Sequence, residues 1–375
     1  MEAYLDNAAT TRPSTAAAEE ALHLMRECWG NPSSGHRLGT EAAAALRLAR
    51  RRAARALGAP EDRVFFTSGG TEADNWAVFG AMARMGKRGR HIITTAVEHH
   101  AVLEPIRELE RRGYEVTRLM PDGEGRISLA DFTEALRPDT VFCSVMMVNN
   151  ESGAIMPIRE MASALHRRNP DALFHTDAVQ GLGKVAFRAS SLGADLISVS
   201  AHKIHGIKGA GALYIRKDLP LPPFVYGGGQ ESGFRSGTEA LPAIGAFGAA
   251  CEALEPSTDI PRMAALRDLC LEQLTGRVPD LVTVGAHDAP HILTVSLPGA
   301  RSQGILNLLQ EQGVAVSAGS ACSKGHRSHV LEAMGLPAAV IDGAVRISLC
   351  RETTPEEIEL LVTAMEQTAH RLLSR

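Results

Sequence analysis

Short apolar runs recur along this chain with helical patterns between them, and this alternation constrains the fold more than any other feature. The runs are rich in β-branched residues and are bounded by glycine or polar residues, as buried strands are. Strands that alternate with helices form crossover units, which build a mostly parallel sheet covered on both faces. The sequence therefore predicts an α/β fold with strands near residues 64–67, 91–97, 115–119, 141–148, 172–176, 195–200 and 211–215.

From about residue 255 the pattern changes to fewer strands separated by longer helices. Strands are expected near residues 281–284, 291–297, 314–317 and 344–349. The last helix has clear signals, because Thr354 can cap it, Pro355 suits its first turn, and Ile358, Leu361, Val362 and Met365 share one face. We expect a smaller second domain here.

The first long helix is predicted over residues 40–57, which are rich in Ala, Leu and Arg. Gly58 follows, a residue typical of helix C-termini. The three consecutive arginines at 50–52 are expected to form a solvated face.

Composition narrows the classes of protein. The length of 375 residues suggests roughly two domains. A charged fraction of 22% and a net charge of −4 argue against disorder and against binding to nucleic acid or an anionic membrane. The first residues lack a basic region followed by an apolar one, and no stretch approaches eighteen apolar residues. We therefore expect a soluble cytoplasmic protein.

The six cysteines form no C-x-x-C pair, which favours reduced thiols. Cys143 lies in an apolar run and is predicted to be a buried hydrophobic residue. Cys322 instead lies among small, polar and basic residues, which indicate a loop. A nearby cation would favour its thiolate.

Chemically distinctive residues follow the predicted strands where the strands end. A glycine-rich turn at 68–72 opens a helix and suits a phosphate, and a histidine pair follows at 99–100. Asp177 and Lys203 follow two further strands and lie 26 positions apart. Ligands of parallel sheets bind beyond these strand ends, so an anion site, a ring, an acid and an amine should converge. Pyridoxal phosphate requires such a set.

The chain resembles the cysteine desulfurases of the class V aminotransferase group, which are fold type I pyridoxal phosphate enzymes. The resemblance runs from residues 4–11 to 346–348. The most specific segments are 67–72 (TSGGTE), 98–99 (EH), 149–153 (NNESG), 176–180 (TDAVQ), 200–203 (SAHK), 235–238 (RSGT) and 317–322 (SAGSAC). It implies a large cofactor-binding domain of residues 15–254 with a mostly parallel seven-stranded sheet. Residues 1–14 and 255–375 would form a smaller α+β domain that carries the acceptor-cysteine loop.

The resemblance also implies roles around the cofactor ring. Lys203 would form the Schiff base, Asp177 would pair with the pyridine nitrogen, and Gln180 would bond the ring hydroxyl. His99 would stack on the ring and help to move protons.

The phosphate and the substrate would be held by other residues. The resemblance assigns the phosphate to Gly70, Thr71, Ser200 and His202, and to Thr238 from the other subunit of a homodimer. Asn150 and Arg346 would face the substrate, whose carboxylate the guanidinium would bind in a bidentate pair.

Cys322 would accept the sulfur. By the same resemblance, L-cysteine loses its sulfur to the Cys322 thiolate and leaves as L-alanine, and the persulfide passes to an acceptor protein. That acceptor is left open between an iron–sulfur scaffold and a tRNA-thiolation enzyme. No metal ion and no direct contact with nucleic acid or membrane are expected.

Two features depart from the family pattern. Ile207 stands where many relatives have proline, and the segment from Cys322 to Val330 is shorter than in the housekeeping iron–sulfur desulfurases. The first change should be tolerated, whereas the second bears on the reach of the loop and hence on its partner.

Several other interpretations stay open. An aminotransferase or a selenocysteine lyase of the same fold would use the same cofactor, and a non-catalytic scaffold would keep only the fold. Residues 200–203 also match the S-x-x-K of serine acyl enzymes, although no S-D-N or K-T-G follows. A zinc module would draw on His99, His100, His202 or His205, but H-E-x-x-H and clustered cysteines are absent from the sequence.

Overall fold

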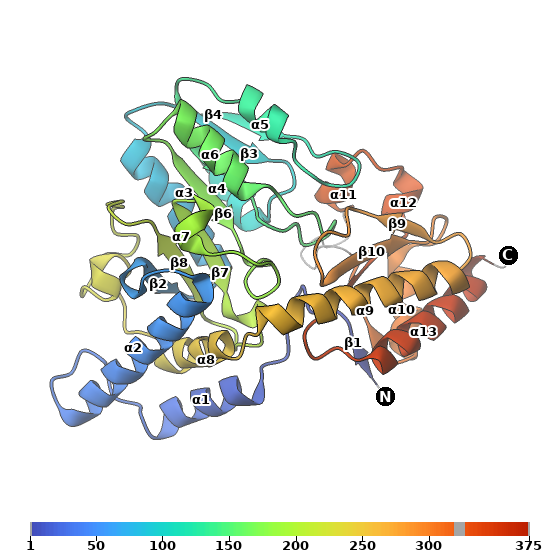
Figure 1. Cartoon of the computed structure of the whole chain (residues 1–375), viewed down its shortest axis with the longest axis horizontal. Helices are drawn as coiled ribbons and strands as arrows, with labels where there is room; N and C mark the ends of the chain where they lie inside the picture. Colours follow the sequence, from blue (N-terminus) through green and yellow to red (C-terminus); the bar gives the residue numbers. More distant parts are fainter. Residues whose placement is uncertain (1, 319–326, 374–375) are drawn as a thin grey trace.

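A seven-stranded sheet lies at the centre of the larger part of the molecule (Figure 1). The computed structural model describes residues 2–318 and 327–373. The strands of this sheet are β2 (Val64–Thr67), β3 (His91–Thr95), β4 (Glu115–Leu119), β5 (Thr140–Ser144), β6 (Leu173–Asp177), β7 (Leu196–Ser200) and β8 (Gly211–Ile215). Their order is β2-β8-β7-β6-β5-β3-β4, and β8 runs antiparallel to both of its neighbours while the other pairs are parallel. The predicted mostly parallel seven-stranded sheet is confirmed.

Consecutive residues on the strands pack into two different cores. Phe66 and Ile93 belong to the core beneath one face of the sheet, whereas Phe65 and Ile92 belong to the core beneath the other. Side chains alternate between the two faces of a strand, so both faces must be covered. This coverage explains why the strands appear in the sequence as continuous apolar runs.

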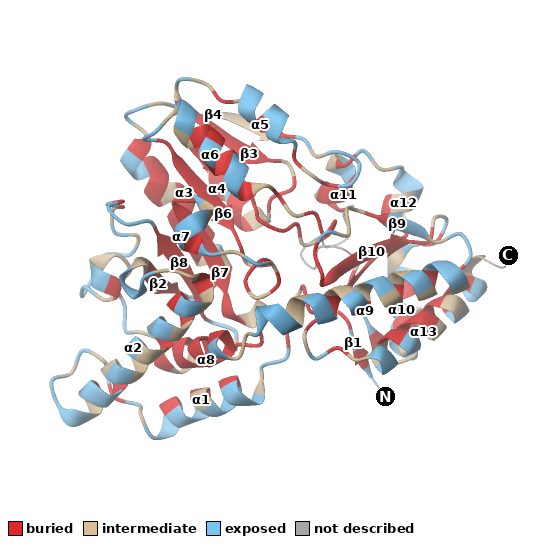
Figure 2. Ribbon diagram, viewed as in Figure 1, coloured by how far each residue is buried: buried red, intermediate tan, exposed pale blue. Residues whose placement is uncertain are grey.

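Helices cover both faces of the sheet. The helices of this part are α1 (Thr15–Arg26), α2 (Arg37–Leu57), α3 (Gly70–Met85), α4 (His100–Arg111), α5 (Leu129–Glu134), α6 (Ile158–Arg168), α7 (Ala189–Leu192) and α8 (Leu241–Glu252). Helices α3 and α4 cover one face, while α2, α5, α6 and α8 contribute to the core on the other. Figure 2 shows the strands buried between helices whose outer faces are exposed.

The C-terminal part has its own core. Its elements are α9 (Pro256–Arg277), β9 (Val282–Val284), β10 (Ile292–Ser296), α10 (Ser302–Glu311), β11 (Val314–Ala315), α11 (His329–Ala333), α12 (Ala338–Asp342), β12 (Ala344–Ser348) and α13 (Pro355–Leu373). Strands β12, β10 and β9 form an antiparallel sheet against α9, α10 and α13. The smaller α+β part predicted after residue 255 is therefore present.

The chain start joins this second core. A short strand, β1 (Ala3–Tyr4), pairs with β11, and both Ala3 and Leu5 are buried in the C-terminal core. This packing favours assigning residues 1–14 to the small domain, and the boundaries at 14/15 and 254/255 stay a prediction. No described helix is both long enough and apolar enough to cross a membrane.

The final helix begins as predicted. The Thr354 hydroxyl accepts from the Glu357 amide at 3.3 Å, and the Glu357 carboxylate accepts from the Thr354 amide at 2.9 Å. This reciprocal pair is a capping box, which satisfies two amides that the helix leaves free. Ile358 and Met365 are fully buried on the predicted apolar face.

The expectation of a solvated face at residues 50–52 is wrong for Arg50 and Arg52. The Arg50 guanidinium bonds both carboxylate oxygens of Glu231 at 2.7 Å, and Glu231 also accepts from the Phe66 amide. Arg52 pairs with Glu252 at 2.6 Å. Such pairs join segments far apart in the sequence, so a local charge run could not predict them.

Candidate active site

A cavity of about 260 Å³ opens where β6 and β7 end. Every predicted site residue that the structure describes, except Thr238, lines it, namely Gly70, Thr71, His99, Asn150, Asp177, Gln180, Ser200, His202, Lys203 and Arg346. Strands β6 and β7 are parallel neighbours, with Asp177 opposite Ser198, so their ends bring the predicted acid and amine together. A larger cavity of about 520 Å³ beside α2 contains none of these residues.

One end of the cavity is built to receive an anion. Helix α3 begins at Gly70, and Gly69 before it offers no side chain to cap the first amides. A Cβ on Gly70 would lie 2.8 Å from the Val179 side chain, so only glycine keeps this approach open. The Ser200 hydroxyl is buried without a hydrogen-bond partner among the described residues. Free amides, the helix dipole and an unpaired hydroxyl suit a phosphate.

The acid lies deep in the cavity. Asp177 ends β6 and is buried, and its Oδ1 accepts from the Val179 amide at 2.8 Å. Burial raises the pKa of Asp177 to about 6, while the Val179 amide and Lys203 oppose that rise. A cationic ring nitrogen at this position would stabilise the charged carboxylate.

The amine is held at the edge of β7. Lys203 follows β7 in the short turn Ala201–Lys203, and its Nζ donates to the carbonyl oxygens of Ala8 and Ala9, both at 2.7 Å. The amine is thus fixed by two backbone carbonyls that lie 195 and 194 positions earlier in the chain.

The histidine near the amine is neutral. The Nδ1 atom of His99 accepts from the Ala101 amide at 3.1 Å, so the neutral ring carries its proton on Nε2. Burial, followed by the charge of Lys203, lowers the pKa of His99 to about 4. The ring can therefore offer an N–H group at neutral pH.

A buried arginine lies at the substrate end of the cavity. Arg346, on β12, is 2% exposed and donates to the Asn150 carbonyl at 3.0 Å and to Asp6 Oδ1 at 2.8 Å. Its Nε is buried without a partner among the described residues. A guanidinium with unused donors in a desolvated site can bind a carboxylate.

Sequence reasoning missed two contributors to this site. Asp74, one turn after Gly70 on α3, lines the cavity and is 1% exposed, and burial together with Asp177 raises its pKa. Its position two residues after the predicted anion-binding turn at 68–72 was a usable signal. The carbonyl oxygens of Ala8 and Ala9 carried no such signal, because backbone acceptors are the same in every residue.

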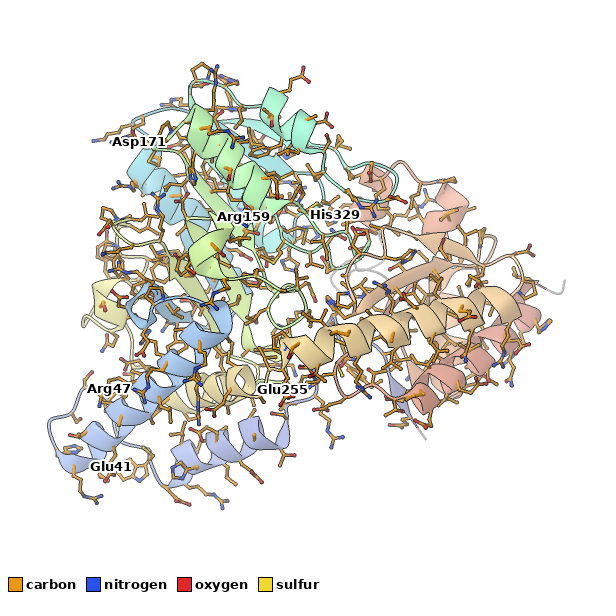
Figure 3. The ribbon with its side chains drawn as sticks, viewed as in Figure 1. Glu41, Arg47, Arg159, Asp171, Glu255 and His329 are labelled. Carbon is orange, nitrogen blue, oxygen red and sulfur yellow. The ribbon has the colours of Figure 1, made fainter. Side chains whose placement is uncertain are left out.

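Of the two remaining predicted residues, Thr238 does not line the cavity of this chain. Thr238 is exposed. Cys322 lies outside the described residues, whose chain stops at 318 and resumes at 327. Before this gap, Ser317 exchanges backbone hydrogen bonds with Arg346. After it, His329, which Figure 3 labels, donates to the Glu98 carbonyl at 3.1 Å. Both flanks of the predicted acceptor segment therefore contact the surroundings of the cavity.

Glu98, next to His99, leads to a prediction about stability. Its Oε1 accepts from Thr95 and from the Met146 amide, whereas Oε2 is buried without a partner among the described residues. Burial raises the pKa of Glu98 to about 8 from an ordinary 4.5. A raised carboxyl pKa means that the stability present below pH 4.5 is lost as the pH rises toward 8.

Glu98→Gln should remove this loss, because the amide keeps the Oε1 contacts and cannot ionise. We expect its stability relative to the wild type to grow by up to about 1.4 kcal/mol per pH unit between about pH 4.5 and 8. Urea unfolding of the cofactor-free protein across this range measures the difference. Exposed Glu255→Gln is the control, and a pH-independent difference for Glu98→Gln would contradict the prediction.

The cavity fits pyridoxal phosphate. Gly70, Thr71 and Ser200 suit its phosphate, Asp177 its ring nitrogen, and Lys203 its aldehyde. The described residues contain no group of three His, Cys, Asp or Glu side chains that could hold a metal ion.

Known proteins resemble the whole chain. Residues 3–361 match the family described as aminotransferase class-V. The cysteine desulfurase IscS of Dictyoglomus turgidum is 41% identical over 377 residues, which cover 99% of this chain and 95% of that protein. A solved NifS-like protein has a TM-score of 0.93 at 37% identity and covers 99% of this chain and 100% of its own. SspA, solved in complex with cysteine, has a TM-score of 0.82 at 32% identity, covering 94% and 100%. The family match spans every residue that lines the cavity.

Proposed function

Because this chain belongs to the class V aminotransferase family and is a pyridoxal-phosphate-dependent cysteine desulfurase, we propose that the cavity around Lys203 is its active site. The observation that carries this proposal is the meeting of an amine, a buried acid and an uncapped helix start in one cavity. The structure of SspA with cysteine supports L-cysteine as the substrate.

The cofactor is held by residues of the large part of the molecule. Gly70, Thr71, Ser200 and His202 bind the phosphate, Asp177 keeps the ring nitrogen protonated, and Lys203 forms the covalent link. Pyridoxal phosphate, when bound, supplies a protonated ring that stores the electron pair released at the substrate Cα. Burial makes Asp177 effective, since its charge is poorly screened in this cavity.

The carboxylate of the substrate orients it in the cavity, and Lys203 and His99 transfer protons. Arg346 binds the carboxylate, and Asn150 lies beside it. Lys203 Nζ moves the proton of the substrate Cα, and the Nε2–H of His99 serves as a donor toward the reacting groups. The low pKa of His99 keeps it neutral for this task.

The thiolate of Cys322 then takes the sulfur. It attacks the substrate sulfur, the carbon–sulfur bond breaks, and its electron pair returns to the substrate carbon, which gains a proton. L-Cysteine and a thiol thus become L-alanine and a Cys322 persulfide, with atoms and electrons balanced. An acceptor protein, either an iron–sulfur scaffold or a tRNA-thiolation enzyme, removes the terminal sulfur.

The working unit is a homodimer in the cytoplasm. Thr238 is exposed and away from the cavity of its own chain, which is compatible with a contact to the phosphate in the partner. The five cysteines that the structure describes form no disulfide, which suits a reducing compartment.

The proposed reaction is tested by its products. The purified protein, loaded with pyridoxal phosphate and given L-cysteine with a reducing thiol, should release L-alanine and sulfide in equal amounts. Transfer of the amino group to a 2-oxo acid without sulfide would favour an aminotransferase. Turnover restricted to L-selenocysteine would favour a selenocysteine lyase.

Replacing Arg346 should mainly weaken substrate binding. Arg346→Gln removes a charge-assisted hydrogen bond, so we expect KM for L-cysteine to rise about ten- to a hundredfold with a smaller change in kcat. Steady-state kinetics measure the split between the two constants. The exposed Arg47→Gln is the matched control (Figure 3). A fall in kcat at unchanged KM would assign Arg346 to the chemical step instead.

A further inference from the structure

Two buried donors surround one oxygen of the Gln180 side chain. Gln180 Oε1 lies 3.4 Å from Lys184 Nζ and 3.2 Å from His291 Nε2. Its Nε2 donates to the Ala8 carbonyl at 2.8 Å, the same oxygen that accepts from Lys203. Gln180 itself lines the cavity, whereas Lys184 and His291 lie behind it and do not.

This arrangement fixes which way the amide points. Turning the amide over would leave the Ala8 carbonyl, which can only accept, facing an oxygen, so the amide nitrogen faces Ala8 and Oε1 faces Lys184 and His291. The neutral His291 ring therefore carries its proton on Nε2. The amide nitrogen has two hydrogens, and Ala8 uses one of them. The second is the hydrogen that Gln180 can offer to a molecule in the cavity.

Burial of these two polar groups costs desolvation free energy, which argues that they have a function. Lys184 is 4% exposed and His291 is fully buried. Burial, then the charge of Lys203, lower the pKa of Lys184 to about 7, although Cys350 opposes this shift. Burial also holds the pKa of His291 well below its ordinary value, so its ring is neutral, and its Nδ1 has no partner among the described residues. An apolar side chain in place of Lys184 would avoid this desolvation.

We propose that Lys184 and His291 are positioning residues that hold the Gln180 amide with its N–H toward the cavity, so that Gln180 donates a hydrogen bond to the ring oxygen of the cofactor. This inference rests on the proposed function, because it needs the cofactor in this cavity. Neither residue touches the reacting atoms in the proposal. Both act through Gln180.

The expected consequence is spectroscopic. A hydrogen-bond donor at the ring oxygen stabilises the negative charge of that oxygen. The oxygen then attracts less strongly the proton on the nitrogen that would link Lys203 to the cofactor, so the pKa of this nitrogen is lowered. Without the donor, the pH midpoint of the visible absorption band should rise. Lys184→Met removes one of the two groups that orient the amide, and we expect a rise of about one pH unit, the size of one lost hydrogen bond to a charged group.

A double-mutant cycle separates this effect from the loss of a nearby charge. Gln180→Met should raise the midpoint by at least as much as Lys184→Met, and the double variant should match Gln180→Met alone. If the two shifts add, Lys184 acts directly through its charge and the inference is overturned. His291→Phe is the second variant, and it should shift the midpoint in the same direction without removing a charge.

Controls distinguish this inference from the proposed function. Exposed Lys217→Met should leave the midpoint unchanged. Circular dichroism of each variant reports folding, and equilibrium dialysis reports cofactor affinity. A wild-type protein that takes up no pyridoxal phosphate would overturn the proposed function. A normal wild-type spectrum with additive or absent shifts would overturn only the roles of Lys184 and His291.

Discussion

Lys203→Ala should leave a folded protein that binds pyridoxal phosphate weakly and turns over L-cysteine about 10⁴-fold more slowly. The size follows from the two tasks of this amine, because a positioned acid–base group alone contributes up to about 10⁴-fold. The amine is also the proposed point of covalent attachment. Ala8 and Ala9 would lose a donor, but their carbonyls can recruit water from the cavity, so a large loss of stability is not expected.

Borohydride reduction of the loaded wild-type protein, followed by peptide mass mapping, tests the attachment directly. The label should be found at Lys203 and should be missing from Lys203→Ala. Exposed Lys217→Ala is the matched control for removing a lysine. Lys184 is the informative alternative, since it is a buried amine bonded to Gln180. A label at Lys184 would contradict the assignment of Lys203 as the point of covalent attachment.

The strands were predictable because burial on both faces of the sheet produces continuous apolar runs in the sequence. Residues 64–67 and 211–215 match β2 and β8 to the residue, and both strands are buried throughout. The prediction for β5 ran four residues too far, to Val148, because residues 145–148 are as buried as the strand although they leave the ladder. Apolar sequence reports burial rather than pairing. Strand β1 was missed for the opposite reason, since its two residues, which pair with Val314 and Ala315, leave no periodic pattern.

The site was predictable as far as strand ends determine it. Parallel neighbours bring their carboxyl ends to one edge, so Asp177 and Lys203 had to meet. Contacts between distant segments were not predictable in this way. The carbonyls that hold Lys203, the Glu231 partner of Arg50, and the donors behind Gln180 all depend on how the chain folds back on itself. Long-range packing decides these contacts, and local sequence carries no trace of it.

The thiols that the structure describes are poor candidates for accepting sulfur. Burial raises the pKa of Cys143, Cys251, Cys270 and Cys350, which makes their reactive thiolates scarce. Cys28 is less buried, yet burial and the nearby Glu41 and Glu20 raise its pKa as well. The acceptor should therefore be Cys322, whose flanking residues contact the surroundings of the cavity.

Cys322→Ala should abolish persulfide formation and slow the release of L-alanine by at least about a hundredfold, because the substrate sulfur then has no nucleophile to accept it. The visible band of the bound cofactor should be unchanged, and it should still respond to L-cysteine, since neither Lys203 nor Arg346 is altered. Alkylation of the protein after one turnover, with mass mapping of the modified cysteine, measures the first effect, and single-turnover L-alanine release measures the second. Cys28→Ala is the matched control and should retain both. A persulfide on Cys28, or L-alanine release at the wild-type rate from Cys322→Ala, would mean that sulfur leaves by a route that does not use this thiol.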